Sequence, residues 1–69
     1  MKTYIPIPSS ERGSNYSVAG ETWCENFKRA AFAKKYAVAA TKETGSLVTV
    51  LRESDKQVWR PDTRKWSNS

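Results

Sequence analysis

Histidine is absent from this chain, and cysteine and glycine are scarce. Without histidine, neither a Ser-His-Asp nor a Cys-His catalytic arrangement can form. Cys24 is the single cysteine, so the chain has no partner for an internal disulfide, and one thiol among scattered carboxylates does not make a zinc site. Gly13, Gly20 and Gly45 are too dispersed for a phosphate-binding loop. These absences predict a protein that is not an enzyme and that holds no metal or cofactor.

Long apolar runs are also missing. No stretch approaches the roughly 18 apolar residues of a membrane span. The first residues, "MKTYIPIPSSERG", contain no apolar segment typical of a signal peptide. A lone cysteine fits a reducing compartment. We therefore expect a cytoplasmic protein with no membrane partner.

Charge of one sign is in excess. Twelve basic and seven acidic residues give a net charge of +5, which favours an acidic protein surface or nucleic acid as partner. The 69 residues suffice for a single domain, residues 1–69, of marginal stability. Its stability must come from packing, from self-association or from a partner, which leaves a monomer and a homodimer both open.

The N-terminal third carries weak structural signals. Residues 2–7, "KTYIPI", alternate at period two and predict a short strand. Pro6 and Pro8 lack the N–H needed for ladder hydrogen bonds, so this strand should lie at a sheet edge. Residues 8–21 are rich in Ser, Gly and Asn and predict a loop.

Residues 22–43 predict a long helix. Thr22 and Glu25 have the spacing of a capping box, and the following "RAAFAKKYAVAAT" holds six alanines. Lys42 suits the negative end of the helix dipole, and Gly45 is a natural stop.

The C-terminal third predicts a hairpin. Residues 47–53 are rich in β-branched residues and leucine, and residues 57–60 follow a turn at Ser54-Asp55-Lys56. We interpret residues 62–69 as a tail. The predicted fold is α+β with the order β-α-β-β, in which one long helix packs on a three-stranded, mainly antiparallel sheet.

The helical periodicity of residues 22–43 predicts a protein-binding surface. Trp23 and Phe27 share an apolar stripe that should face the sheet, and Lys34 interrupts this stripe. Phe32 and Tyr36 fall on the opposite side of the predicted helix, where exposed rings indicate an interaction site. Alternatively, Tyr16 or Trp66 covers them. The predicted protein-binding residues are Lys28, Arg29, Phe32, Lys35 and Tyr36.

The segment "QVWRPDTRKW" supports a second hypothesis. Single-strand binders combine aromatic rings with surrounding cations on a sheet face. This nucleic-acid surface would consist of Arg52, Trp59, Arg60, Arg64, Lys65 and Trp66. It depends on Trp59 pointing to the open face, whereas a domain this small needs its large side chains inside. We therefore expect Trp59 to point inward.

These patterns predict a small binding protein that docks on another macromolecule. The first hypothesis is a protein-interaction module with an acidic partner, such as a modulator of a larger enzyme. Phage- or plasmid-type accessory proteins have this format, although no motif indicates one. The alternative is a single-stranded DNA or RNA binder.

Overall fold

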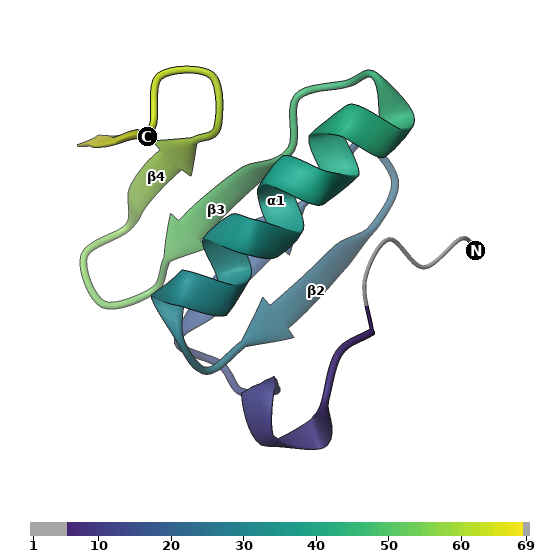
Figure 1. Cartoon of the computed structure of the whole chain (residues 1–69). Helices are drawn as coiled ribbons and strands as arrows, with labels where there is room; N and C mark the ends of the chain where they lie inside the picture. The colour runs from purple at the N-terminus through teal and green to yellow at the C-terminus, as the bar shows by residue number, and fades with distance from the viewer. Residues whose placement is uncertain (1–5, 69) are drawn as a thin grey trace.

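A single helix packs on one face of a five-stranded antiparallel sheet in the computed structural model, which describes residues 6–68 (Figure 1). A 3₁₀ turn, η1 (Ser9–Glu11), precedes the sheet, and the helix is α1 (Ala30–Thr44). The strands are β1 (Tyr16–Ala19), β2 (Cys24–Phe27), β3 (Thr49–Arg52), β4 (Gln57–Arg60) and β5 (Lys65–Asn68). They lie in the order β2-β1-β3-β4-β5. The predicted α+β class is confirmed, with the element order β-β-α-β-β-β.

The predicted helix over residues 22–43 is wrong in its first third, because that part forms β2. Trp23 and Phe27 are four residues apart, a spacing that fits one face of a helix and also one face of a strand. In the structure Phe27 pairs with Tyr16 of β1, and Cys24 pairs with Ala19. Gly20 permits the turn between these strands, since a Cβ there would lie 2.4 Å from the Trp23 indole.

Helix α1 therefore begins at Ala30, after Arg29, which occupies the N-cap position without a side-chain cap. The helix ends as predicted at Gly45, whose φ of 75° is left-handed and whose N–H donates to the Thr41 carbonyl at 2.9 Å. Ala33, Tyr36, Ala37 and Ala40 form the buried stripe of α1. Small alanines on this stripe let the helix approach the sheet closely.

The remaining differences concern the segments predicted as irregular. The predicted loop over residues 8–21 contains η1 and β1, and the predicted tail over 62–69 contains β5. The predicted hairpin of β3 and β4 is present, with Val50 opposite Trp59. Most of the predicted edge strand over residues 2–7 lies outside the described residues. Ile7, which is described, belongs to no strand and packs against the core.

The core lies between α1 and the sheet. Its largest fully buried side chains include Tyr36, Phe27, Val18 and Val50. Trp59 is 4% exposed, so the prediction that it points inward is confirmed. Tyr36 is 1% exposed, which corrects its predicted place on the outer side of the helix. The error has one cause: the helical phase was set by Trp23 and Phe27, which lie directly before β2 and at its end.

An ion pair fastens η1 to the start of α1. Glu11 is a charged residue in a buried position, and its carboxylate accepts two hydrogen bonds from Arg29, one of them from Nε at 3.1 Å. The Lys28 N–H also donates to the Glu11 carbonyl at 2.7 Å. The Arg29 hydrogen bond holds the pKa of the Glu11 carboxyl below its usual value. Arg29, predicted as a protein contact, thus has a structural partner.

Candidate nucleic-acid interface

The helix covers only part of the sheet face on which it packs. Alternation along the strands places Arg52, Gln57, Trp59 and Trp66 on the helix side, together with the buried Val50. Helix α1 packs mainly on β1, β2 and β3, whereas β4 and β5 extend beyond its flank (Figure 1). On this face Trp59 of β4 is nonetheless buried, whereas Gln57, Trp66 and Asn68 are half-buried or exposed beside the helix.

Trp66 is the centre of the accessible part. It lies opposite Trp59 across the β4–β5 ladder and is half-buried. The guanidinium carbon of Arg52 is 4.3 Å from the centre of its ring, within the range of a cation–π contact. The ring of Tyr16 lies 6.2 Å from it at an interplanar angle of 46°. Three strands thus contribute to one aromatic and cationic cluster.

Lys34 joins the helix to this cluster. Its amine lies 5.6 Å from the Trp59 ring centre and 5.5 Å from that of Trp66. The lysine also borders a shallow hollow of about 260 Å³, which Lys35, Val38, Trp59 and Arg64 complete. Lys34 is half-buried while Lys35 is exposed, so the stem of Lys34 packs as its amine reaches the rings.

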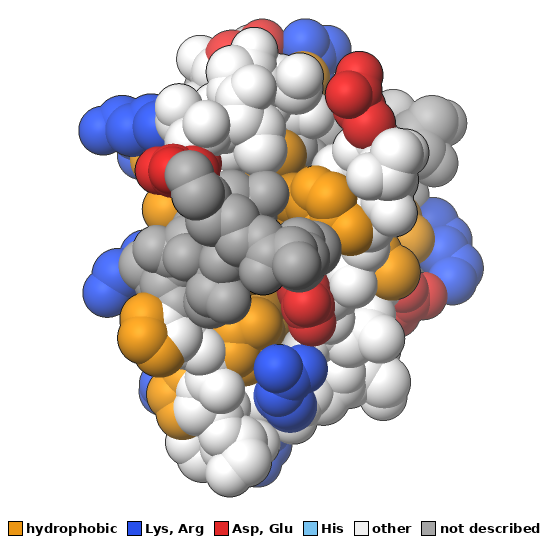
Figure 2. Space-filling model, turned by 90° about the vertical axis from the view of Figure 1, so that its right-hand side faces the viewer, with side chains coloured by type: hydrophobic (Ala, Val, Ile, Leu, Met, Phe, Trp, Pro, Cys, Tyr) orange, Lys and Arg blue, Asp and Glu red, His pale blue; other side chains and the backbone are white. Residues whose placement is uncertain are grey.

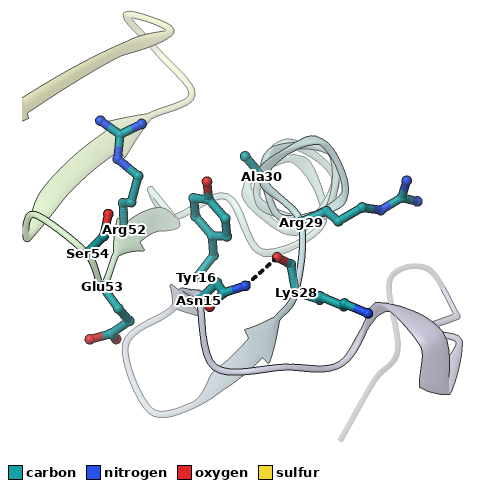
Figure 3. Close-up of a pocket in the computed structure, with 8 residues that line it drawn as sticks. All are labelled: Asn15, Tyr16, Lys28, Arg29, Ala30, Arg52, Glu53 and Ser54. Atoms are coloured by element: carbon teal, nitrogen blue, oxygen red, sulfur yellow. Dashed lines mark hydrogen bonds between the residues drawn. The ribbon is translucent and has the colours of Figure 1, made fainter.

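A second hollow lies on the other side of Trp66. Its volume is about 590 Å³, and it opens between the start of α1 and the end of β3. Figure 3 shows Tyr16 and Arg52 extending to the same side of this hollow, whereas the side chains of Arg29 and Lys28 point away from Tyr16. Each hollow therefore has lining residues that contact Trp66, namely Tyr16 and Arg52 in this one and Lys34 in the other.

We call this region the cation–aromatic surface. It consists of Tyr16, Lys34, Lys35, Arg52, Arg64 and Trp66, and the buried ring of Trp59 packs against it from the core. Arg52 is paired with Asp55, but none of the ion pairs within residues 6–68 includes Lys34, Lys35 or Arg64. The surface therefore carries positive charge that no carboxylate within the described chain neutralises.

The structure separates the predicted nucleic-acid residues into three groups. Arg52, Arg64 and Trp66 take part in the cation–aromatic surface. Trp59 is 4% exposed and belongs to the core, so the open-face position that the nucleic-acid hypothesis required for Trp59 is wrong. Arg60 and Lys65 are register partners on the opposite, open face of the sheet, since they alternate with Trp59 and Trp66. Arg60 is held there by Asp62 through bonds of 3.2 and 3.0 Å.

The predicted protein-binding residues do not form one exposed cluster. Tyr36 is in the core, and Phe32 is half-buried against Phe27, with ring centres 5.5 Å apart. Lys28 is exposed but precedes the helix, on the side of η1. Lys35 is exposed on α1 and belongs to the cation–aromatic surface instead.

Sequence reasoning missed Tyr16 and Lys34 as members of this surface. Tyr16 lay in a segment predicted as a loop, so its strand position was not visible. Lys34 did give a signal, because it interrupts an otherwise apolar helical stripe. A buried stem carrying a cation beside two indoles explains that interruption.

Figure 2 shows the side of the molecule near β2, where basic, acidic and apolar side chains are interspersed. Among residues 6–68, no group of three or more Cys, Asp or Glu residues is placed to hold a metal ion. In the same range, no helix has both the length and the apolar character needed to cross a membrane.

Comparisons of the chain with protein-family models, with curated proteins and with solved structures found no match.

Proposed function

We propose that this protein binds single-stranded nucleic acid through the cation–aromatic surface. The observation that carries the proposal is that two cations lie near the ring of Trp66, Arg52 at 4.3 Å and Lys34 at 5.5 Å from its centre. Single-strand binders use aromatic side chains for base stacking and nearby cations for the phosphates. Both components are present here, on strands β3 and β5 and on helix α1.

The aromatic component favours an unpaired strand over a duplex. Bases in a duplex are stacked on one another and expose only their edges, whereas a single strand can place a base against a ring or a guanidinium plane. Arg52 lies over Trp66 and extends the stack toward solvent. A base can therefore stack on Arg52 in its present position, or on Trp66 once Arg52 moves to a phosphate.

The cationic component would follow the backbone on both sides of the rings. Lys35 and Arg64 border the hollow beside Trp59 and are exposed. Each phosphate contact by such a residue releases counterions, and binding must weaken as salt rises. The net charge of +5 adds a longer-range attraction to polyanions.

Docking on an acidic protein has less support from the geometry. That hypothesis rested on Phe32 and Tyr36 as exposed anchors, and Tyr36 is 1% exposed. Binding to a nucleic acid needs no catalytic group, metal or cofactor, which agrees with the non-enzymatic interpretation of the sequence.

A fluorescence-anisotropy titration tests the proposal. The probe is a labelled oligonucleotide of about 12 nucleotides, single-stranded or annealed to its complement. We expect the single strand to bind more tightly than the duplex at about 50 mM salt, and to lose affinity steeply by about 200 mM. Replacing Lys35 by Gln should reduce the slope of log K against log salt by about 0.7. Absence of single-strand binding at low salt contradicts the proposed function.

Lys42 provides a matched control for that experiment. It is an exposed lysine in the last turn of the same helix, away from the rings. Lys42→Gln makes the same change in net charge as Lys35→Gln. Because Lys42 lies away from the rings, this substitution should leave the slope of log K against log salt nearly unchanged. Equal effects of the two substitutions would indicate a diffuse charge effect and would place the binding site elsewhere.

A further inference from the structure

Two side-chain amides lie next to the cation–aromatic surface on the same sheet face. Gln57 is the register partner of Arg52 in β3 and of Asn68 in β5, so these three residues form a row across the sheet. The next row on this face contains Trp59 and Trp66. Residues two apart on one strand are separated by about 6.7 Å. The amides are therefore one residue row from the indole of Trp66.

The two amides hold each other in a fixed orientation. Nε2 of Gln57 donates to Oδ1 of Asn68 at 2.7 Å. This bond leaves the Oε1 of Gln57 free to accept and the Nδ2 of Asn68 free to donate. Gln57 is half-buried, and its backbone N–H is bound to Asp55 at 3.2 Å, which further limits its movement. The face thus presents an acceptor and a donor in a preset arrangement.

We propose that Gln57 and Asn68 read the edge of a base stacked over Trp66 or Arg52, and that they prefer adenine to the pyrimidines. This inference rests on the proposed function and gives it a base preference. Stacking and phosphate contacts are indifferent to sequence, whereas a fixed donor and acceptor distinguish base edges. Adenine pairs an amino donor with a ring-nitrogen acceptor on both its Watson–Crick and its Hoogsteen edge, so it matches the amide pair in two orientations.

Cytosine and thymine offer such a match only on the Watson–Crick edge. Arg52 connects base recognition by the amides with base stacking on the rings. It is the register partner of Gln57 and also the cation over Trp66. A base placed on Arg52 lies with its edge toward the amides. In a duplex the Watson–Crick edges are occupied, and this adds a second reason for selection of a single strand.

The test compares single-stranded oligo-dA, oligo-dC and oligo-dT of equal length, about 12 nucleotides, at one salt concentration. We expect wild-type protein to bind oligo-dA about twofold more tightly than oligo-dT, because the amide pair matches adenine in two orientations and thymine in one. Gln57→Thr and Asn68→Thr, which keep strand-forming residues, should bring this ratio to about one. The ratio is informative because a structural defect would lower the affinity for all three oligonucleotides together.

Asn26 supplies the matched control. It is an exposed strand asparagine on the open face, hydrogen-bonded across the ladder to Ser17 at 2.9 Å. Asn26→Thr should leave the dA-to-dT ratio unchanged. Equal affinity of wild-type protein for all three oligonucleotides overturns the adenine inference while the proposed function stands, as does a preference for cytosine or thymine. Failure of wild-type protein to bind any of the three overturns the proposed function itself.

Discussion

The guanidinium of Arg52 lies over the ring of Trp66, with Cζ 4.3 Å from the ring centre. Asp55 fixes the guanidinium through bonds of 3.1 Å from Nε and 3.0 Å from Nη2. These bonds raise the pKa of Arg52 and lower the pKa of Asp55, so both groups remain charged at neutral pH. Two of the five guanidinium N–H groups bind Asp55, and hydrogen bonding to the Tyr16 side chain also contributes to the raised pKa of Arg52.

Removal of the Trp66 ring should weaken binding without unfolding the protein. Trp66 is half-buried at the end of the sheet, and base stacking on an aromatic ring contributes about 1–3 kcal/mol. We expect Trp66→Ala to lower the affinity for a single-stranded oligonucleotide about tenfold or more, as measured by anisotropy, with a folded circular-dichroism spectrum. Trp23→Ala, which removes a half-buried indole near β2, is the control. Comparable losses in the two variants would argue against stacking at Trp66.

Replacing Arg64 by glycine should weaken binding while leaving the stability of the protein nearly unchanged. Its φ of 57° is left-handed, a conformation that costs a non-glycine residue about 1 kcal/mol. Glycine relieves this strain but adds chain entropy, so Arg64→Gly should leave the free energy of unfolding within about 1 kcal/mol of wild type. Affinity for the oligonucleotide should fall, because an exposed cation beside the rings is lost.

Lys56 is the control for Arg64, since it occupies the equivalent place in the preceding turn. Its φ is 59°, and its N–H donates to the carbonyl of Arg52 at 2.8 Å, as that of Arg64 donates to Arg60 at 2.7 Å. Lys56→Gly removes the same charge and the same strain, but Lys56 pairs with Glu53 and does not border the hollow beside Trp59. If Lys56→Gly weakens binding as much as Arg64→Gly, the prediction that Arg64 contacts the nucleic acid beside the rings is wrong.

Tyr36 and Phe32 should differ clearly in their effect on stability. Tyr36 is fully buried and lies 5.2 Å from Phe27 and 6.2 Å from Trp23, measured between ring centres. Truncation of a buried aromatic residue to alanine costs about 3–5 kcal/mol, a large share of the stability of a domain this size. Urea denaturation of Tyr36→Ala should show a largely unfolded protein. Phe32→Ala should lose less free energy of unfolding, because Phe32 is only half-buried. The reverse order would contradict the position of Tyr36 in the core.

The Glu11–Arg29 pair should make stability depend on pH. Arg29 lowers the pKa of Glu11 in the folded protein below its ordinary value of 4.5. The stabilisation is therefore present above that value and is lost as the pH falls through the folded pKa. Between about pH 6 and pH 3, the difference in free energy of unfolding between wild type and Glu11→Gln should shrink. A difference that stays constant across this range would show that the carboxylate charge contributes nothing.

The sequence predicted the fold class and the β3–β4 hairpin because their signals are local. Val50 and Trp59 lie in short β-rich runs on either side of a polar turn, and the alanine-rich run ends at a glycine. Strand β2 was missed because the spacing of Trp23 and Phe27 fits both helix and strand periods. Pairing with β1 decides between them, and that contact is not visible in the local pattern.

The candidate site was only partly predictable for a related reason. Arg52, Trp59, Arg64 and Trp66 come from one continuous stretch of sequence, which drew attention to them together. Their separation from Arg60 and Lys65 depends on the strand phase of β4 and β5. The contributions of Tyr16 and Lys34 depend on β1 lying beside β3 and on the rotation of α1, both of which are set by tertiary packing.

The most direct test of the central claim is an NMR titration of the ¹⁵N-labelled protein with an unlabelled single-stranded oligonucleotide. The indole N–H signal of Trp66 and the amide signals of Lys34, Arg52 and Arg64 should shift with a common saturation curve, while those of Cys24 and Asn26 should remain in place. Shifts centred on β2 or on the open sheet face, or no shifts at low salt, would contradict the account.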